Sequence, residues 1–394
     1  MSASLSSIAQ YQTIGKIHRY DAGLDALLDT SAKIEIVAQG FTWSEGPVWV
    51  KKEGYLLFTD VPENTIHKWS EAKGLEVFLK PSGYTGTGVY SEEPGANGLI
   101  INTKGNLVSC EHGDRRIAEM PLHHPDQKKT LAHTYEGKQL NSPNDLVQKK
   151  SGDYYFTDPP YGLPGRGKPE PAKELDFQGV YRIDTKGQTS LQIKDLGRPN
   201  GLAFNPDESI LYVGTSEPPT YIKAYPVDKQ GNLGEGRVFF DAAELAKQGI
   251  RGGYDGMKVD AKGNVWVANF GTSSPSARYS IVQLCGATSN CPAGIAMGTA
   301  ITPDTGYTLP SAGSQVLLNS GQPLYGTGAP PSYLPLMRLT SVNADMAGNI
   351  WAANNWKPSG LNDLLLNPGG DGMVIFIGVA APTKAPSLGP AQSP

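Results

Sequence analysis

The segment GDYYFTDPP at residues 152–160 decides the fold, because its pattern recurs along the chain. In each copy a polar turn precedes a short aromatic or aliphatic run, which closes on a small polar residue. The copies are EGYLLFTDVP (53–62), GNLVSCEHG (105–113), GDYYFTDPP (152–160), ESILYVGTSEP (208–218), GNVWVANFG (263–271) and GNIWAANNW (348–356). The first five are spaced by roughly 50 residues and the last follows a gap of about 85, and such spacing indicates a repeat architecture.

A second short segment precedes each copy and ends in alternating apolar residues. These segments are SEGPVWV (44–50), GANGLII (95–101), SPNDLV (142–147), RPNGLAF (198–204), YDGMKVD (254–260) and LTSVNAD (339–345). Further β-like runs follow most copies. Short alternating runs between Gly, Asn and Asp turns are typical of antiparallel strands. About four strands per unit at this period indicate the blades of a β-propeller.

The sequence therefore predicts an all-β protein that folds as one six-bladed β-propeller. The run KIEIVAQGF (33–41) precedes the first inner strand and has no partner in its own blade. We expect it to form the outer strand of the last blade, because closing the ring in this way removes an exposed sheet edge. A loose N-terminal extension is the alternative for this run.

The propeller is expected to span residues 33–380, after an N-terminal extension at residues 1–32. A Gly/Ser/Pro-rich stretch at about 287–338 is predicted to be an insertion, either a lid or a flexible loop. The Pro-rich tail at 381–394 is expected to be disordered. Whether Cys285 and Cys291 form a disulfide stays open.

Composition and charge exclude several classes of function. The chain has 394 residues, 34 Lys and Arg against 38 Asp and Glu, and a net charge of −4. This balance argues against a nucleic-acid partner, which needs clustered basic residues. No apolar run is long enough to span a membrane. The chain shows no readable signal peptide, which favours the cytoplasm and leaves a secreted or periplasmic location open. Nothing in it indicates the oligomeric state.

Polar residues recur at one position of the inner strands. In a propeller the first strand of each blade lines the central channel, so equivalent positions converge on one axis. Alignment of the six inner segments places these residues at equivalent positions: Glu45, Asn97, Asn144, Asn200, Asp255 and Thr340. At any single position, Asn or Asp before Gly would indicate only a turn. Five carboxylates or carboxamides at equivalent places favour a shared site instead.

Such a ring of oxygen ligands predicts a site for one divalent cation. Calcium or magnesium suits carboxylate and amide oxygens, whereas zinc usually prefers histidine or thiolate. The charges of Glu45 and Asp255 balance a 2+ ion, which offsets the cost of placing them in a narrow channel. The oxygen ligands by themselves leave calcium and magnesium open.

Several motifs resemble one protein family. SEGPVW, SPNDLV, RPNGLAFNPD (198–207) and YDGMKVDAKGNVWVA (254–268) are similar to segments of the gluconolactonase, regucalcin and luciferin-regenerating-enzyme family. EHGDRR (111–116) and YYFTDPPYG (154–162) resemble its bacterial members. The resemblance covers about residues 33–272, and the final segment is more similar to NHL-type repeat propellers.

The resemblance implies a six-bladed propeller with one divalent metal, often calcium, in its channel and an activity that hydrolyses lactones. On this basis we expect calcium, with Mg, Mn or Zn as the alternatives. The family's metal ligands fall on Glu45, Asn144, Asn200 and Asp255. Asn97 does not belong to that set and is carried only by the alignment of the inner strands.

The resulting hypothesis is a metal-dependent hydrolase that opens a sugar lactone or related cyclic ester by attack of activated water. Asp255 is the first candidate for the general base, and His112 is the second. Asn97, Asn144 and Asp145 are expected to bind substrate, and Asp145 also to support Asn144 through a hydrogen bond.

Two alternatives keep the same metal site. In one, the substrate is a phosphotriester; in the other, the propeller is a non-catalytic binding protein with a structural metal. No G-x-S-x-G elbow indicates a serine hydrolase. Arg115 and Arg116 are expected to form a solvated surface pair rather than to contact an acidic substrate.

Overall fold

The computed structural model describes residues 11–13, 17–19, 22–167, 172–243, 253–270, 280–284, 296–300, 336–344, 350–357 and 372–377. Strands dominate these residues, and three short 3₁₀ turns also lie among them. These are η1 (Ala22–Ala26), η2 (Pro125–Gln127) and η3 (Pro164–Gly167). The all-β prediction is confirmed.

Four sheets are each built from four strands that follow one another in the sequence and pair antiparallel. The first has β4 (Ser44–Val50), β5 (Tyr55–Asp60), β6 (Thr65–Ser70) and β7 (Gly74–Leu79), and the second has β8 (Ala96–Ile101), β9 (Leu107–Glu111), β10 (Arg116–Met120) and β11 (Lys129–Ala132). The third has β14 (Leu146–Gln148), β15 (Tyr154–Asp158), β16 (Gly179–Ile183) and β17 (Thr189–Ile193). The fourth has β18 (Pro199–Phe204), β19 (Ile210–Thr215), β20 (Tyr221–Pro226) and β21 (Arg237–Asp241). A two-stranded sheet, β12 (Thr134–Tyr135) and β13 (Lys138–Gln139), lies between the second and third.

Two further sheets have five strands each, because N-terminal segments join them. One contains β22 (Gly253–Val259), β23 (Val265–Phe270), β24 (Ser280–Leu284), β25 (Ala296–Ala300) and β2 (Ile17–Arg19). The other contains β26 (Leu336–Ala344), β27 (Ile350–Lys357), β28 (Gly372–Ile377), β3 (Ile34–Phe41) and β1 (Gln12–Thr13). The run expected to close the ring, β3, pairs antiparallel with β28, and Ile36 lies opposite Ile375.

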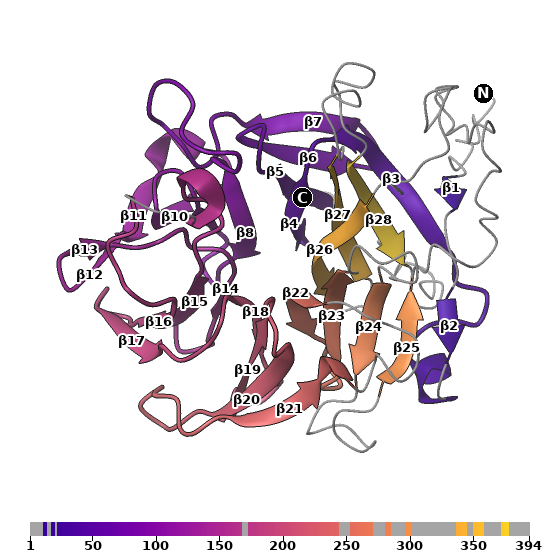
Figure 1. The fold of residues 1–394 in the computed structure, drawn as a ribbon. Coiled ribbons are helices and arrows are strands. Elements are labelled where there is room, and N and C mark those ends of the chain that lie inside the picture. The colour runs from indigo at the N-terminus through magenta and orange to yellow at the C-terminus, as the bar shows by residue number, and fades with distance from the viewer. Residues whose placement is uncertain are drawn as a thin grey trace, which may run out of the picture.

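The sheets are arranged around a common centre (Figure 1). The first strand of each lies nearest that centre, and neighbouring first strands contact one another in the order β4, β8, β14, β18, β22 and β26. Strand β26 in turn contacts β4. This arrangement is a propeller-type fold, and it places the start of every sheet beside a shared axis.

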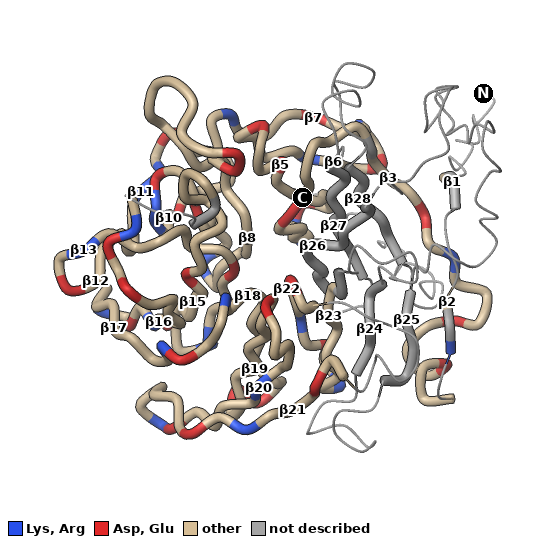
Figure 2. Tube along the Cα trace, viewed as in Figure 1, with Lys and Arg blue, Asp and Glu red and all other residues tan. Residues whose placement is uncertain are grey.

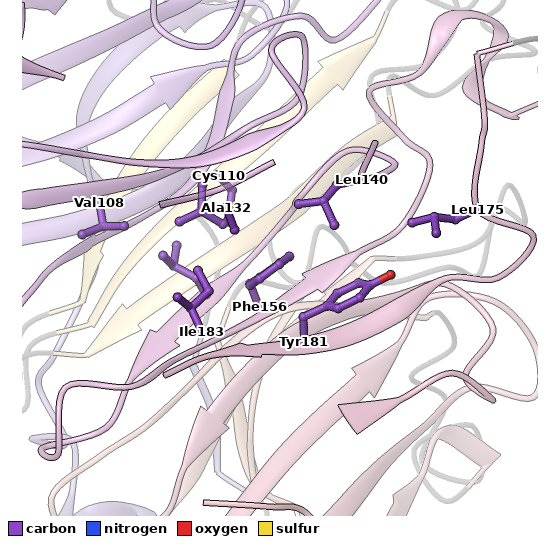
Figure 3. Packing of buried hydrophobic residues seen from close by; sticks show 10 residues of the cluster. Val108, Cys110, Ala132, Leu140, Phe156, Leu175, Tyr181 and Ile183 are labelled. Atoms are coloured by element: carbon purple, nitrogen blue, oxygen red, sulfur yellow. The ribbon is translucent and has the colours of Figure 1, made fainter. Parts of the chain in front are cut away.

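The core lies between the faces of neighbouring sheets. One cluster joins the sheet of β8–β11 to that of β14–β17, with Val108 and Cys110 facing Phe156 and Ile183 (Figure 3). Because each sheet is covered on both faces, its central strands read as nearly continuous apolar runs. All six residues of β5, YLLFTD, are buried. The strand cysteine, Cys110, is fully buried in this core.

Charged residues of both signs are interspersed along the described chain (Figure 2). Within the described part, no helix is long and apolar enough to span a membrane. The tail at 381–394, Cys285 and Cys291 lie outside the described residues. Of the insertion at 287–338, the structure describes only β25 and the first three residues of β26.

Candidate functional site

The inner strands share a local irregularity at the positions that the sequence alignment singled out. The pairing register shifts between Glu45 and Val48 in β4, Ala96 and Leu99 in β8, Pro199 and Leu202 in β18, Tyr254 and Met257 in β22, and Leu339 and Ser341 in β26. A β-bulge leaves residues out of the ladder and re-aims their side chains. Asn97, Asn200 and Asp255 fall within these shifts, Glu45 adjoins one, and Asn144 lies two residues before β14.

Glycines bring neighbouring inner strands into close contact. A Cβ added to Gly98 would lie 2.6 Å from the main-chain oxygen of Asn144, and the Gly98 N–H donates to that oxygen at 2.8 Å. In the same way, a Cβ on Gly46 would collide with the Asn97 carbonyl, and one on Gly201 with the Asp255 carbonyl. The glycine after each of Glu45, Asn97 and Asn200 therefore lies against the backbone of the site residue on the next sheet.

Five of the aligned residues line one pocket at the common centre of the sheets. This central pocket has a volume of about 180 Å³ and is lined by residues that include Glu45, Asn97, Asn144, Asn200 and Asp255. Each of the five is at most 5% exposed. The sixth aligned residue, Thr340, lies in β26, where the structure describes the backbone only.

Hydrogen bonds orient two of these side chains. The Trp43 Nε1–H donates to Oε1 of Glu45 at 3.2 Å. The Asn200 Nδ2–H donates to Ser216 Oγ at 3.0 Å, and that hydroxyl donates to the Tyr254 carbonyl at 2.7 Å. With Nδ2 engaged in this chain of bonds, the carbonyl oxygen Oδ1 is the amide atom of Asn200 that can serve as a ligand.

The donor set fits a hard divalent cation. Among the described residues, no group of three or more His, Cys, Asp or Glu side chains is placed to hold a metal ion. The carboxylates of Glu45 and Asp255 and the amide oxygens of Asn144 and Asn200 line the central pocket together and could combine around one cation. An all-oxygen set of two negative charges and two neutral donors suits calcium or magnesium better than zinc.

His112 lies behind the pocket rather than in its wall. It is fully buried, and burial lowers the pKa of its imidazole to about 4, so the ring is neutral near pH 7. Its Nδ1 lies 3.3 Å from the main-chain oxygen of Glu93 and 4.0 Å from Oε2 of the same residue. Glu93 itself lines the central pocket, so His112 is placed to act on the pocket through Glu93.

Asp145 lies on the other side of its neighbour Asn144, away from the central pocket. Its carboxylate accepts hydrogen bonds from the Leu146 N–H at 2.8 Å and from Lys258 Nζ at 3.4 Å. With Lys258 it borders a small cavity of about 10 Å³, room for about one water molecule. Glu45, Asn97, Asn144 and Asn200 border the same cavity, which places Asp145 beneath the central pocket rather than in it.

Sequence reasoning missed six residues that line the central pocket. They are Trp43, Glu93, Tyr161, Arg198, Ser216 and Glu217. Trp43 precedes Glu45 by two residues, and Ser216 and Glu217 follow directly after β19, so comparison of the same positions in each repeat could have found these three. Glu93 and Tyr161 lie in connections between strands that follow no repeated pattern.

The expectation of a solvated pair at Arg115 and Arg116 is wrong for Arg115. This residue is 6% exposed, and its guanidinium donates to the main-chain oxygens of Leu140 at 2.6 Å and Ala172 at 2.8 Å. Arg115 also has a positive φ of 54°. Its hydrogen bonds tie together the loops beside the second and third sheets.

A buried carboxyl near this arginine predicts a pH-dependent stability. Burial raises the pKa of Asp158 to about 7, and its Oδ2 accepts a hydrogen bond from the Asn141 N–H at 2.8 Å. The folded pKa exceeds the unfolded value of about 4, so this residue's contribution to stability is full below pH 4 and is lost as the pH rises through 7. We expect Asp158→Asn to become progressively more stable than the wild type over that range, each pKa unit corresponding to about 1.4 kcal/mol.

Denaturant unfolding of both proteins at pH 5, 6, 7 and 8 measures this difference. The pKa of His112 also differs between the folded and unfolded states. Its contribution to stability is the same in the wild type and in Asp158→Asn, so it cancels from the difference between them. Asp184→Asn is the matched control, because an N–H bond from Gln188 lowers the pKa of this exposed carboxyl and limits its effect to acid pH. A constant difference between Asp158→Asn and the wild type from pH 5 to pH 8 would contradict the raised pKa.

Several known proteins are similar to this chain in sequence or in fold. A protein named gluconolactonase from Zymomonas mobilis subsp. mobilis is 41% identical over 263 residues, which cover 65% of this chain and 72% of that protein. A gluconolactonase structure from Xanthomonas campestris has a TM-score of 0.66 at 23% identity and covers 95% of this chain and 99% of its own. The calcium-binding protein regucalcin from Agrobacterium tumefaciens has a TM-score of 0.53 at 16% identity, with 86% and 90% covered. The two structures show a shared fold.

The family model described as the SMP-30/Gluconolactonase/LRE-like region matches residues 43–280. This range holds the five described residues that the inner strands bring to the central pocket, from Glu45 in β4 to Asp255 in β22. The model covers more than half of the chain, so the chain belongs to the SMP-30/gluconolactonase/LRE-like family.

Proposed function

We propose that this protein is a divalent-metal-dependent lactonase that opens a sugar lactone or a related cyclic ester. The observation that carries this proposal is the convergence of four buried side chains on one pocket: Glu45, Asn200 and Asp255 from three sheets, and Asn144 from the segment that enters a fourth. The relative named gluconolactonase supports a lactone as the substrate class. A small-molecule substrate also agrees with a volume of about 180 Å³.

We further propose that the six larger sheets are the blades of a single closed ring. Two observations support closure of the ring. Strand β26 contacts β4, and β3 pairs with β28. With β3 in place, the last blade combines the N-terminal and C-terminal parts of the chain in one sheet, and β1 covers its outer edge. Closure holds the site residues of the first and fifth sheets, Glu45 and Asp255, in the same pocket.

Glu45, Asn144, Asn200 and Asp255 would hold the cation, which when bound would polarise the lactone carbonyl as a Lewis acid. We propose calcium, because the donors are all oxygens and the regucalcin neighbour is a calcium-binding protein. Magnesium or manganese would accept the same ligands, whereas zinc fits them less well.

Other side chains of the pocket would transfer the proton and bind the substrate. Asp255 accepts a proton from the attacking water at its carboxylate, while the water oxygen bonds to the carbonyl carbon. The ring C–O bond breaks, and the departing alkoxide takes that proton back, so the product is a hydroxy acid. Asn97 lines the same pocket and would bind the substrate through its carboxamide. For His112, burial and a low pKa favour positioning Glu93 over direct proton transfer.

Removal of the metal is expected to abolish turnover and to lower the melting temperature. A ligand that binds only the folded state at 100 times its Kd adds about 2.7 kcal/mol to stability, and chelation would remove that contribution. Metal analysis before and after chelation, thermal unfolding and lactonase activity measure the effect, with Ca, Mg and Mn added back in turn. Glu45→Gln is the matched variant, and its stability should respond much less to chelation.

A panel of lactones with one phosphotriester, followed by a pH indicator, separates the candidate functions. Ring opening releases acid, and we expect it with at least one hydroxylated lactone. Turnover of the phosphotriester alone would replace the lactonase proposal. Stabilisation by metal without turnover of any substrate would assign the site to a binding protein.

A further inference from the structure

Arg198 occupies an unusual backbone conformation at the central pocket. Its φ is +48°, in the left-handed region that costs a non-glycine residue on the order of 1 kcal/mol or more. The position lies directly before β18 and two residues before Asn200. Its main-chain oxygen accepts a hydrogen bond from the Ser216 N–H at 3.2 Å, which fixes the chain there. Glycine would fit this conformation without strain.

Two neighbours hold the Arg198 side chain at the pocket. Its Nε lies 2.6 Å from Oε1 of Glu217, and its guanidinium stacks over the Tyr161 ring at 5.2 Å from the ring centre. The side chain is 16% exposed. A guanidinium has five N–H donors, and Arg198 contacts Glu217 through Nε. Among the described residues, no side chain or carbonyl accepts a hydrogen bond from its two terminal nitrogens, which leaves them for a ligand.

These three residues belong to the same pocket as the four proposed metal ligands. Arg198 precedes β18 and Glu217 follows β19 of the fourth sheet, whereas Tyr161 follows β15 of the third, so the three come from two neighbouring sheets. Arg198 is the only Lys or Arg among the residues that line the described pocket, whereas carboxylates are several. An excess of negative charge disfavours an anionic substrate and favours a neutral one.

We propose that Arg198, held by Glu217 and Tyr161, determines specificity for lactones whose ring carries hydroxyl groups. The proposal rests on the lactonase function proposed above. A hydroxyl group both donates and accepts hydrogen bonds. The guanidinium of Arg198 supplies N–H donors, and the carboxylate of Glu217 beside it supplies an acceptor. Tyr161 adds an aromatic face near that pair. An unsubstituted lactone of the same ring size has no group that uses the pair, so the pair distinguishes the two substrates.

Three variants test the role: Arg198→Gln, Arg198→Lys and Arg198→Gly. For a hydroxylated six-membered lactone, we expect Arg198→Gln and Arg198→Gly to raise KM about 10–100-fold, the range for losing a hydrogen bond to a charged group. With δ-valerolactone, which has no hydroxyls, kcat/KM should stay within about 2-fold. Arg198→Lys keeps the charge without the planar fork and should recover part of the loss. Arg237→Gln, on the exposed strand β21, is the control and should change neither substrate.

The glycine variant separates recognition from structural support. Because glycine relieves the left-handed strain, Arg198→Gly is expected to melt close to the wild-type temperature. It should nevertheless lose the preference for the hydroxylated lactone over δ-valerolactone. A large fall in melting temperature with discrimination between the two lactones intact would overturn the proposal. An equal loss of kcat/KM for both lactones in Arg198→Gln would also overturn it, because it would place the residue in the chemistry or the fold.

Binding of 1,5-anhydroglucitol, a hydroxylated ring without an ester, tests Arg198 independently of turnover. Calorimetry or ligand-observed NMR should detect binding to the wild type and a loss of about 10-fold or more in Arg198→Gln. No binding to the metal-loaded wild type, or equal binding to both proteins, would overturn the role of Arg198 whether or not the enzyme opens lactones. Binding that depends on Arg198 in a protein that opens no lactone would reject the lactonase function and retain the recognition of hydroxylated rings.

Discussion

Replacing Asp255 by asparagine is expected to lower kcat for lactone opening by about 10²–10⁴-fold, the usual contribution of a general base. Asparagine keeps one oxygen at this buried position, so the pocket retains its shape and a possible ligand. It cannot accept the proton of the attacking water. A pH-indicator assay at saturating substrate measures the fall, and metal analysis of the same sample shows how much cation remains.

The matched control for this variant is Asp195→Asn. The Asp195 side chain is 73% exposed, and its carboxylate lies 4.0 Å from Lys223 Nζ, away from the pocket. We expect this change to leave kcat within about 2-fold, since surface pairs contribute little. Full turnover by Asp255→Asn at unchanged metal content would remove Asp255 as the base, even if the lactonase function stood.

Replacing Gly201 by alanine is expected to destabilise the fold by about 1–3 kcal/mol and to reduce activity as well. The added Cβ would collide with the main-chain oxygen of Asp255 and the main-chain nitrogen of Met257. These are backbone atoms of the next inner strand, so no side-chain rotation relieves the contact. The strands must separate, which displaces Asn200 from Asp255. Denaturant unfolding and the lactonase assay measure the two effects.

Gly197→Ala is the control for this substitution, four residues earlier on the same segment. A Cβ at Gly197 meets no atom within 4 Å, and the residue has no positive φ. We expect it to leave both stability and kcat nearly unchanged. If Gly201→Ala were as stable and active as Gly197→Ala, close approach of the inner strands would not be what holds the site together.

The strands were predictable because their signal is local. Turns such as Gly152-Asp153 and runs such as YYF at 154–156 specify a hairpin within about ten residues, and β14 and β15 pair there. The polar residues of the first strands were predictable because the sequence pattern repeats. Residues at equivalent positions of successive sheets must face the same axis. For that reason Asn97 reaches the central pocket although the family resemblance did not include it among the ligands.

Other residues could not be placed from the sequence, because their surroundings come from distant segments. His112 follows a strand and resembles a catalytic histidine, yet it is fully buried and packs against Gly162 and Glu93. Asp145 neighbours Asn144 but pairs with Lys258, 113 residues away. Arg115 is buried by contacts with segments 25 and 57 residues further along.

The sequence by itself determined the all-β architecture, the repeated sheet and the residues that face the axis, because period-2 alternation and turn chemistry act over a few residues. Only the tertiary structure decided which polar side chains meet in the pocket and which lie behind or beneath it. Arg198, Glu217 and Tyr161 come from three separate connections, and packing of whole sheets sets the distances between them. Such contacts depend on rigid elements meeting across the ring, and no local pattern encodes that geometry.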